Sequence, residues 1–142
     1  MIEIRPARDE SEVAAALALR EEVFCGEQGV SLEEERDGRD AEALHLVAIE
    51  GGAVVATCRL LLEEREVKLG RMAVARAVRG RGLATALLVE ADARALELGA
   101  RRIVLAAQLS ARAIYERAGY GAYGEVFLDA GIEHVMMAKR LA

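Results

Sequence analysis

The hydrophobic and polar positions near the N-terminus predict a strand followed by two helices. Residues 2–7 alternate between apolar and polar side chains as in a short strand, and Pro6 marks the end of that strand. Residues 11–25 carry apolar side chains at helical spacing, and Ser11 is a typical N-cap for this helix. A second, shorter helix is predicted over residues 32–36.

The next part of the chain has the pattern of consecutive β-hairpins. Residues 43–62 form two β-rich runs on either side of a Glu-Gly-Gly sequence at residues 50–52, which is a typical hairpin turn. A second tight turn at residues 63–66 leads to a third β-rich run at residues 67–74. We therefore expect three successive antiparallel strands.

A helix and a buried strand follow. From Leu83 onward the apolar side chains recur every 3.6 residues, and Gly99 is a natural end for this helix. Residues 102–109 form an apolar run that is typical of a buried strand.

The last segments complete the predicted fold. A short helix is expected between Ser110, as its N-cap, and Gly119, and two strands are expected around a turn at residues 129–131. Helical crossovers imply parallel strand pairs and hairpins imply antiparallel ones. The pattern predicts one α/β domain over residues 1–142, with a mixed sheet.

Size and composition agree with a globular domain. The chain has 142 residues, of which 54% are hydrophobic, enough to bury a core. No apolar run approaches the length of a membrane span, and the first ten residues lack the apolar core of a signal peptide, so we expect a cytoplasmic protein. The two cysteines and two histidines stand too far apart to suggest a disulfide framework or a zinc site, and we predict no metal.

The net charge and the aromatic content of the chain limit the classes of ligand that we expect it to bind. A formal net charge of −5 and an aromatic content of 4% argue against nucleic acid as the main partner. The densest acidic segment lies at residues 31–40. It is interpreted either as a solvated surface or as a region that attracts a cationic substrate.

A cluster of arginines and glycines lies just before the helix that begins at Leu83. The first turn of a helix has unpaired N–H groups and the positive end of the helix dipole, so it attracts anions. Gly80 and Gly82 remove side chains that would keep a phosphate from these N–H groups, and arginines beside them add positive charge. This indicates a phosphate-bearing ligand, most simply a pyrophosphate. The alternative is a glycine-rich loop whose arginines only increase solubility.

Two other phosphate-binding patterns fit less well. A dinucleotide-binding loop would need a third small residue at Thr85 and an acidic residue in the strand at residues 103–109, which has none. A Walker A loop is excluded because no Gly-Lys-Ser/Thr follows the glycines. A nucleotide-binding α/β domain remains an alternative interpretation.

Several segments resemble a known family. RGRGLA, at residues 79–84, resembles the coenzyme A signature Gln/Arg-x-x-Gly-x-Gly/Ala of the GNAT-type N-acetyltransferases, and residues 71–88 follow that family's strand-loop-helix pattern. AQLSARAIYERAGY, at residues 107–120, resembles the family's later helix that ends in Tyr-Glu-x-x-Gly-Phe/Tyr. Residues 20–48 and 131–139 are similar to the ElaA-like branch of this superfamily.

The resemblance implies a fold and an activity. The expected GNAT-like fold has a central mixed sheet flanked by about four helices, in which the strand at residues 72–74 splays from the strand at residues 103–109. The expected activity is transfer of an acetyl group from acetyl-CoA to a primary amine by direct attack, without a covalent intermediate or a metal. The alternative is a non-catalytic coenzyme A-binding sensor or regulatory module. The acceptor would be a small-molecule or peptide amine, and the family also suggests a homodimer through the last strands.

The resemblance also assigns roles to individual residues. Tyr115 aligns with the tyrosine that protonates the leaving thiolate, and Glu27 is the preferred base or water-chain partner. A backbone N–H near Met72 would stabilise the oxyanion. The predicted cofactor-binding residues are Met72, Ala73, Val74, Arg79, Gly80, Arg81, Gly82, Leu83, Ala84, Thr85 and Gln108.

Alternatives remain for these roles. Tyr115 also fits a core-facing residue whose hydroxyl finds a structural partner. Glu27 also fits a surface glutamate or a structural hydrogen-bond acceptor. Gln28, His45 and His134 are weaker candidates for the acceptor site, and a structural role is preferred for both histidines.

Overall fold

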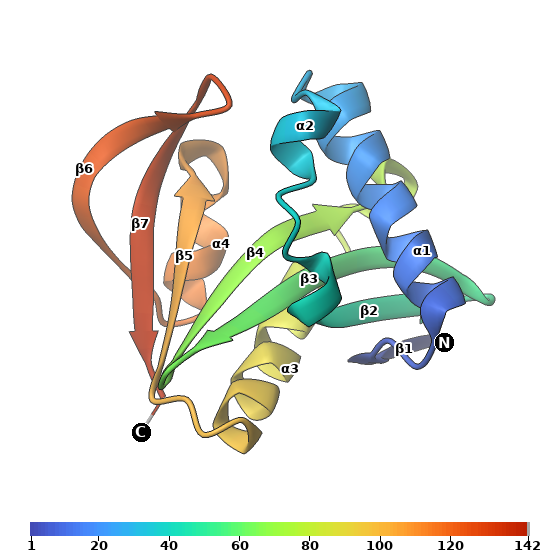
Figure 1. The fold of residues 1–142 in the computed structure, drawn as a ribbon, viewed down its shortest axis with the longest axis horizontal. Coiled ribbons are helices and arrows are strands. Elements are labelled where there is room, and N and C mark those ends of the chain that lie inside the picture. The colour runs from blue at the N-terminus through green and yellow to red at the C-terminus, as the bar shows by residue number, and fades with distance from the viewer. Residues whose placement is uncertain (142) are drawn as a thin grey trace.

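Seven strands form one mixed sheet in the order β1-β2-β3-β4-β5-β7-β6 (Figure 1). The computed structural model describes residues 1–141. Only β4 and β5 pair in parallel, and all other neighbours are antiparallel, which confirms the predicted mixed sheet. The strands are β1 (Ile2–Pro6), β2 (Leu44–Glu50), β3 (Ala53–Glu63), β4 (Glu66–Val74), β5 (Arg102–Gln108), β6 (Gly121–Asp129) and β7 (Ile132–Arg140).

Helices cover both faces of the sheet. Helices α1 and α2 lie on one face, and α3 lies on the other (Figure 1). Helix α4 packs into the same core as α3, through Ile114 and Tyr115. The four helices agree with the prediction, and their bounds are α1 (Glu10–Arg20), α2 (Leu32–Glu35), α3 (Leu83–Glu97) and α4 (Arg112–Arg117). Within residues 1–141, no helix is both long enough and apolar enough to cross a bilayer.

The N-cap predicted at Ser11 is wrong. Helix α1 begins earlier, because Asp9 is extended, with φ −153°, and its carboxylate accepts a hydrogen bond from the Glu12 N–H at 2.9 Å. The Glu12 carboxylate in turn accepts two bonds from the Arg5 guanidinium of β1, at 2.7 and 2.8 Å. This ion pair fixes the start of the helix against the first strand.

The end of this helix also differs from the prediction. A π-helix, η1 (Glu21–Glu27), takes over where an α-helix was expected to continue to residue 25. The Gln28 N–H donates to the carbonyl of Val23, five residues earlier, at 3.1 Å. Such π-turns often occur at functional sites, because the additional residue changes the direction of the side chains.

Ser110 is not the N-cap of the short helix. A 3-10 turn spans Leu109–Ala111, and α4 begins after it with Ala111 in the cap position and no side-chain cap. The helix ends near Gly119 as predicted, because that glycine adopts φ +99°.

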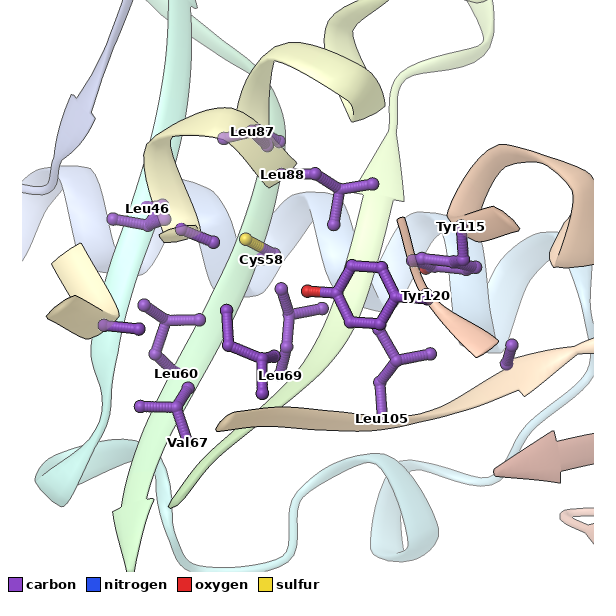
Figure 2. Close-up of a cluster of buried hydrophobic side chains, with 14 of the residues drawn as sticks. Leu46, Cys58, Leu60, Val67, Leu69, Leu87, Leu88, Leu105, Tyr115 and Tyr120 are labelled. Carbon is purple, nitrogen blue, oxygen red and sulfur yellow. The ribbon is translucent and has the colours of Figure 1, made fainter. Parts of the chain in front are cut away.

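The main core lies between the sheet and α3. The buried stripe of α3 consists of Leu83, Leu87, Leu88, Ala91 and Ala95, in agreement with the 3.6-residue pattern. Figure 2 shows part of this cluster, in which Leu87 and Leu88 face side chains of β3, β4 and β5. Tyr115 and Tyr120 lie at one side of it (Figure 2).

A β-bulge divides β4 into two halves. Thr57 of β3 pairs with Ala73 and Arg59 pairs with Gly70, so Arg71 and Met72 together oppose a single residue. Before the bulge, alternate side chains face α3. After it the alternation is inverted, so that Met72 packs on the main core and Ala73 packs against α1.

The bulge lies where β4 leaves β5. These two strands pair only from Glu66 to Lys68 of β4 and from Arg102 to Val104 of β5. Beyond these residues the strands diverge, and the sheet opens into two arms (Figure 1). The splayed pair predicted from the family resemblance is therefore present.

A network of buried ions holds α1 and α2 on this face. The Arg20 guanidinium donates to Glu35 at 2.9 Å and to Asp40 at 2.7 Å, and Arg20 and Glu35 are only 1% and 2% exposed. Arg59 donates to Asp37 at 2.8 Å, and this bond holds the pKa of the Asp37 carboxyl well below its usual range.

Arg71 connects this network to the bulge. Its backbone adopts φ +55°, which is unusual for a residue with a side chain. Its guanidinium donates to the carboxylate of Glu35 at 3.0 Å and to the carbonyl of the same residue at 2.9 Å. The interpretation of residues 31–40 as a solvated surface is therefore wrong for the buried Glu35 and the half-buried Asp40, which form ion pairs with arginines, whereas Asp37 is exposed and also pairs with an arginine.

We expect Glu35→Ala to destabilise the fold by about 3–5 kcal/mol, because it removes one partner of a buried ion pair. The free energy of unfolding, measured in denaturant, tests this. Glu33→Ala changes an exposed neighbour and serves as the control, with an expected effect of about 0.5 kcal/mol or less. Equal losses for the two variants would contradict the structural role of the network.

Candidate active site

A cavity of about 830 Å³ occupies the opening between β4 and β5. It extends from the loop before α3, along β4 and the end of β5, to the turn between β6 and β7. Helix α4 contributes one wall, and residues around η1 and α2 contribute another. The cavity therefore runs from the glycine-containing loop before α3 to both faces of the opened sheet.

The first turn of α3 forms one end of the cavity. Gly82 occupies the N-cap position with φ +78°, and no side chain caps this end of the helix. Gly80 adopts φ +81°, and a Cβ placed on either glycine would meet no heavy atom within 4 Å. The first turn of α3 therefore has no side-chain cap and no side chain at Gly80 or Gly82, which are the features that the predicted anion site requires.

The arginines of the loop are held by carboxylates. The Arg79 guanidinium donates to both carboxylate oxygens of Glu27, at 3.0 and 2.9 Å, and to the carbonyl of Val74 at 3.0 Å. Arg81 pairs in the same way with Glu50 of β2, at 3.1 and 2.6 Å. Arg79 lines the cavity, whereas Arg81 does not.

Strands β4 and β5 place apolar and amide side chains along the cavity. Met72 and Val74 of β4 line it because the bulge turns them in that direction, and the Ala73 side chain does not line it. At the end of β5, the Gln108 amide donates to the side-chain oxygen of Gln28 at 2.9 Å. This bond joins the segment after η1 to the far side of the opening.

Tyr115 of α4 lies in the wall of the cavity. It is 8% exposed, and its ring packs edge to face against Tyr120, with 6.0 Å between the ring centroids. Within residues 1–141 its hydroxyl makes no hydrogen bond, whereas the hydroxyl of Tyr120 is fully enclosed without a partner. Burial raises the pKa of the Tyr115 phenol, so the hydroxyl stays protonated.

Glu27 lies beside the cavity and does not line it. The hydrogen bond from Arg79 is the largest cause that lowers the pKa of its carboxyl. A carboxylate with a lowered pKa is a weaker proton acceptor. The geometry therefore gives less support to the base role predicted for Glu27 than to the role predicted for Tyr115.

Neither cysteine is placed for nucleophilic chemistry. Burial raises the pKa of the Cys58 thiol to about 12, and Cys25 is half-buried outside the cavity. Within residues 1–141, no group of three or more histidine, cysteine or acidic side chains is arranged to hold a metal.

The structure thus brings most of the predicted site residues together around one cavity. The residues that line it are Met72, Val74, Arg79, Gly80, Gly82, Leu83, Ala84, Thr85, Gln108 and Tyr115. Ala73, Arg81 and Glu27 lie next to it. Phe24 and Arg71, which the sequence does not single out, also line the cavity. No local pattern marks them, because their positions depend on η1 and on the bulge.

A protein-family model described as "Acetyltransferase (GNAT) domain" matches residues 6–141. The chain belongs to the GNAT acetyltransferase family. Members of this family transfer an acetyl group from acetyl-CoA, and the predicted fold and enzyme class are confirmed at this level.

Individual GNAT relatives agree over nearly the whole chain. The Bacillus subtilis (strain 168) protein named "Uncharacterized N-acetyltransferase YjcF" is 35% identical over 134 residues, which cover 94% of this chain and 96% of the relative. The crystal structure of a putative N-acetyltransferase from Lactobacillus plantarum matches with a TM-score of 0.91 and 28% identity, over 99% of each chain. Escherichia coli ElaA matches with a TM-score of 0.87 and 26% identity, over 98% of this chain and 99% of that one.

We expect Gly82→Ala to weaken coenzyme A binding by about tenfold, which corresponds to about 1.4 kcal/mol. The new Cβ would lie in the open space that a bound phosphate needs. Isothermal titration calorimetry with coenzyme A measures the effect.

Gly99→Ala is the matched control. Gly99 lies at the other end of α3 with φ +84° and with the same open surroundings. Both variants carry the backbone cost of a side chain at positive φ, about 1 kcal/mol. Only Gly82→Ala should change the affinity, and an equal effect of both variants on binding would argue against the loop as the phosphate site.

Proposed function

We propose that this GNAT protein transfers the acetyl group of acetyl-CoA to a primary amine by direct attack of the amine on the thioester. The observation that carries the proposal is the continuous path from the uncapped first turn of α3 to the opening between β4 and β5. A coenzyme with a pyrophosphate at one end and a long amide-containing arm matches both features.

The cofactor would bind along this path. The N–H groups of the loop and first turn, from Arg79 to Thr85, would hold the pyrophosphate. Because Arg79 is paired with Glu27, an incoming phosphate would compete with that carboxylate for the guanidinium. The arm would then pass between β4 and β5, with Gln108 within reach at the end of β5.

The reacting groups would meet at the bulge of β4. When the amine attacks, negative charge develops on the thioester oxygen, and a backbone N–H near Met72 would stabilise it, an interaction worth about 3 kcal/mol. The bulge supports this role because it interrupts the regular pairing of β4 with β3 at this residue.

Tyr115 would give its proton to the leaving thiolate. A coenzyme A thiol resembles cysteine, with a pKa of about 8.5, and tyrosine has one of about 10. Burial raises the pKa of Tyr115 further, so the phenol is a weaker acid there, and the same apolar wall also disfavours a thiolate next to it. The transfer is therefore complete only when a proton returns to the Tyr115 phenolate.

The enzyme and the non-catalytic alternative differ in one measurable outcome. An N-acetyltransferase releases free thiol from acetyl-CoA continuously when a suitable amine is present, whereas a sensor binds the thioester without turnover. A panel of primary amines that includes polyamines, aminosugars and lysine peptides, assayed by thiol release, separates the two. Binding of NAD or ATP as tight as that of coenzyme A would favour the nucleotide-binding alternative.

We expect Tyr115→Phe to lower kcat by about tenfold or more while the affinity for acetyl-CoA changes little, because only the departing thiolate needs the hydroxyl. Thiol release and calorimetry measure the two quantities. Tyr120→Phe removes the enclosed neighbouring hydroxyl and is the control, with kcat expected to stay near that of the wild type. An unchanged kcat in Tyr115→Phe would remove this residue from the mechanism.

The cytoplasmic location and the homodimer stay predictions from the sequence. For a dimer through the last strands, β6 offers one of the two edges of the sheet, and it carries exposed apolar side chains, among them Leu128 at 70% exposure. Leu128→Lys is expected to shift a dimer towards monomer in sedimentation velocity, whereas Leu96→Lys, on the exposed face of α3, is not. A monomeric wild-type protein would exclude this dimer.

A further inference from the structure

We infer that His134 of β7 is the base that takes a proton from the acceptor amine. This inference rests on the proposed function, because it assigns a residue to the same reaction. A protonated amine has no lone pair with which to attack the thioester, so the acceptor side of the cavity needs a proton acceptor. The geometry of His134 meets that need better than that of His45, Glu27 or Asp37.

Hydrogen bonding fixes the tautomer of the His134 ring. Its Nδ1 lies 2.7 Å from the carbonyl oxygen of Ile132. A carbonyl oxygen only accepts, so Nδ1 carries the hydrogen, and the lone pair of the neutral ring is on Nε2. Within residues 1–141 this Nε2 makes no hydrogen bond, and it is not among the enclosed atoms that lack a partner. A free lone pair on an accessible nitrogen is what a general base requires.

The ring is also held in place. Phe127 of β6 stacks on it, with 5.9 Å between the ring centroids and 26° between the ring planes. His134 is only 9% exposed, and it lines the cavity. The base is therefore ordered before an acceptor arrives, and less conformational entropy is lost when the acceptor binds.

His134 and Tyr115 lie on opposite faces of the opened sheet. The neighbour Val135 packs into the main core with α3 and α4, so the His134 side chain points to the face of α1 and α2. Gln108 pairs with His134 across the two strands and shares that face, where it contacts Gln28. Tyr115 belongs to the core on the other face. The acceptor and the leaving thiolate would thus be served by separate proton-transfer groups.

Other titratable groups are less suited to this role. His45 directs Nε2 at the carbonyl of Asp40, at 2.9 Å, and its Nδ1 is enclosed. Glu27 is engaged by Arg79. Across the cavity from His134, Asp37 is held by Arg59.

Two uncharged residues are the recorded neighbours of His134. Phe127 of β6 stacks on its ring, and Gln108 of β5 is its partner in the strand register. Two carboxylates belong to the β6–β7 hairpin that carries His134. Asp129 lines the cavity, and Glu133, which directly precedes His134, is exposed. Glu34 of α2 also lines the cavity.

The proton and electron balance of the reaction is complete with these residues. His134 Nε2 takes one proton from the ammonium group, and the free amine lone pair forms the C–N bond to the thioester carbon. The C–S bond then breaks, and the thiolate receives the Tyr115 proton. The amide nitrogen loses its surplus proton, which restores the Tyr115 hydroxyl, and His134 releases its own proton to solvent.

His134→Asn tests the assignment. An Asn amide at this position can still donate to the Ile132 carbonyl, but it provides no base. With the amine that the panel identifies as the best acceptor, we expect kcat/KM at pH 7 to fall by about 100-fold. The remaining rate would follow the fraction of unprotonated amine, so the loss should narrow as the pH approaches the amine pKa of about 10.4. The affinity for acetyl-CoA should stay unchanged.

Two further measurements keep the test independent of folding. His45→Asn is the control at the other histidine, and we expect it to lower the melting temperature without altering the pH profile. In the wild-type protein, ¹⁵N-edited NMR of the two imidazole rings reports the tautomers directly, and His134 should be the Nδ1–H form. If His134→Asn melts far below the wild type, His134→Gln is assayed in its place.

The outcomes separate this inference from the proposed function. Thiol release that is unaffected by His134→Asn, or an Nε2–H tautomer in the wild type, overturns the role of His134 and leaves the acetyltransferase intact. Absence of thiol release with every amine overturns both. A large loss with the same pH profile as the wild type would show a structural role and would also overturn the assignment.

Discussion

Between β4 and β5 the hydrogen bonds of a parallel pair stop after Lys68 and Val104, although both strands continue. Main-chain N–H and C=O groups within a sheet normally have partners, because an unpaired buried group costs free energy. Here the two strands stay apart, and residues of both line the cavity between them. A ligand with amide groups of its own can satisfy these main-chain groups, so the break in pairing serves binding as well as shape.

The bulge at Arg71 follows the point where β4 leaves β5, and its conformation is held by ion pairs with buried charge. A residue with a side chain at positive φ is strained, and the bonds from the Arg71 guanidinium to Glu35 hold it there. Glu35 is held in turn by Arg20 of α1. The ion network therefore joins α1 and α2 to β4, the strand at which the proposed reaction takes place, and it gives the acidic segment at residues 31–40 a structural function.

Positive charge near the first turn of α3 is partly paired before any anion arrives. Glu27 holds Arg79 and Glu50 holds Arg81, whereas the Arg76 side chain is 77% exposed and reaches Glu27 only at 3.7 Å. The uncapped N–H groups of the helix remain as the uncompensated positive end. This arrangement favours a ligand whose phosphates fit the main chain closely over one that is attracted by charge alone.

The sequence by itself determined most of the elements, their order and the glycine-containing loop before α3. Periodicity and turn chemistry are local properties, and the glycines at residues 80 and 82 take the left-handed conformation that a side chain resists. Only the tertiary structure decided between Ser11 and Asp9 as the N-cap, because the Glu12 pairing with Arg5 comes from a separate strand. The tertiary structure also decided the position of the bulge and the carboxylate partners of the loop arginines. The residues in these contacts are 31 to 52 positions apart in the sequence. The packing of the elements determines which charged residues form pairs across such sequence separations, and a local sequence pattern does not predict these pairs.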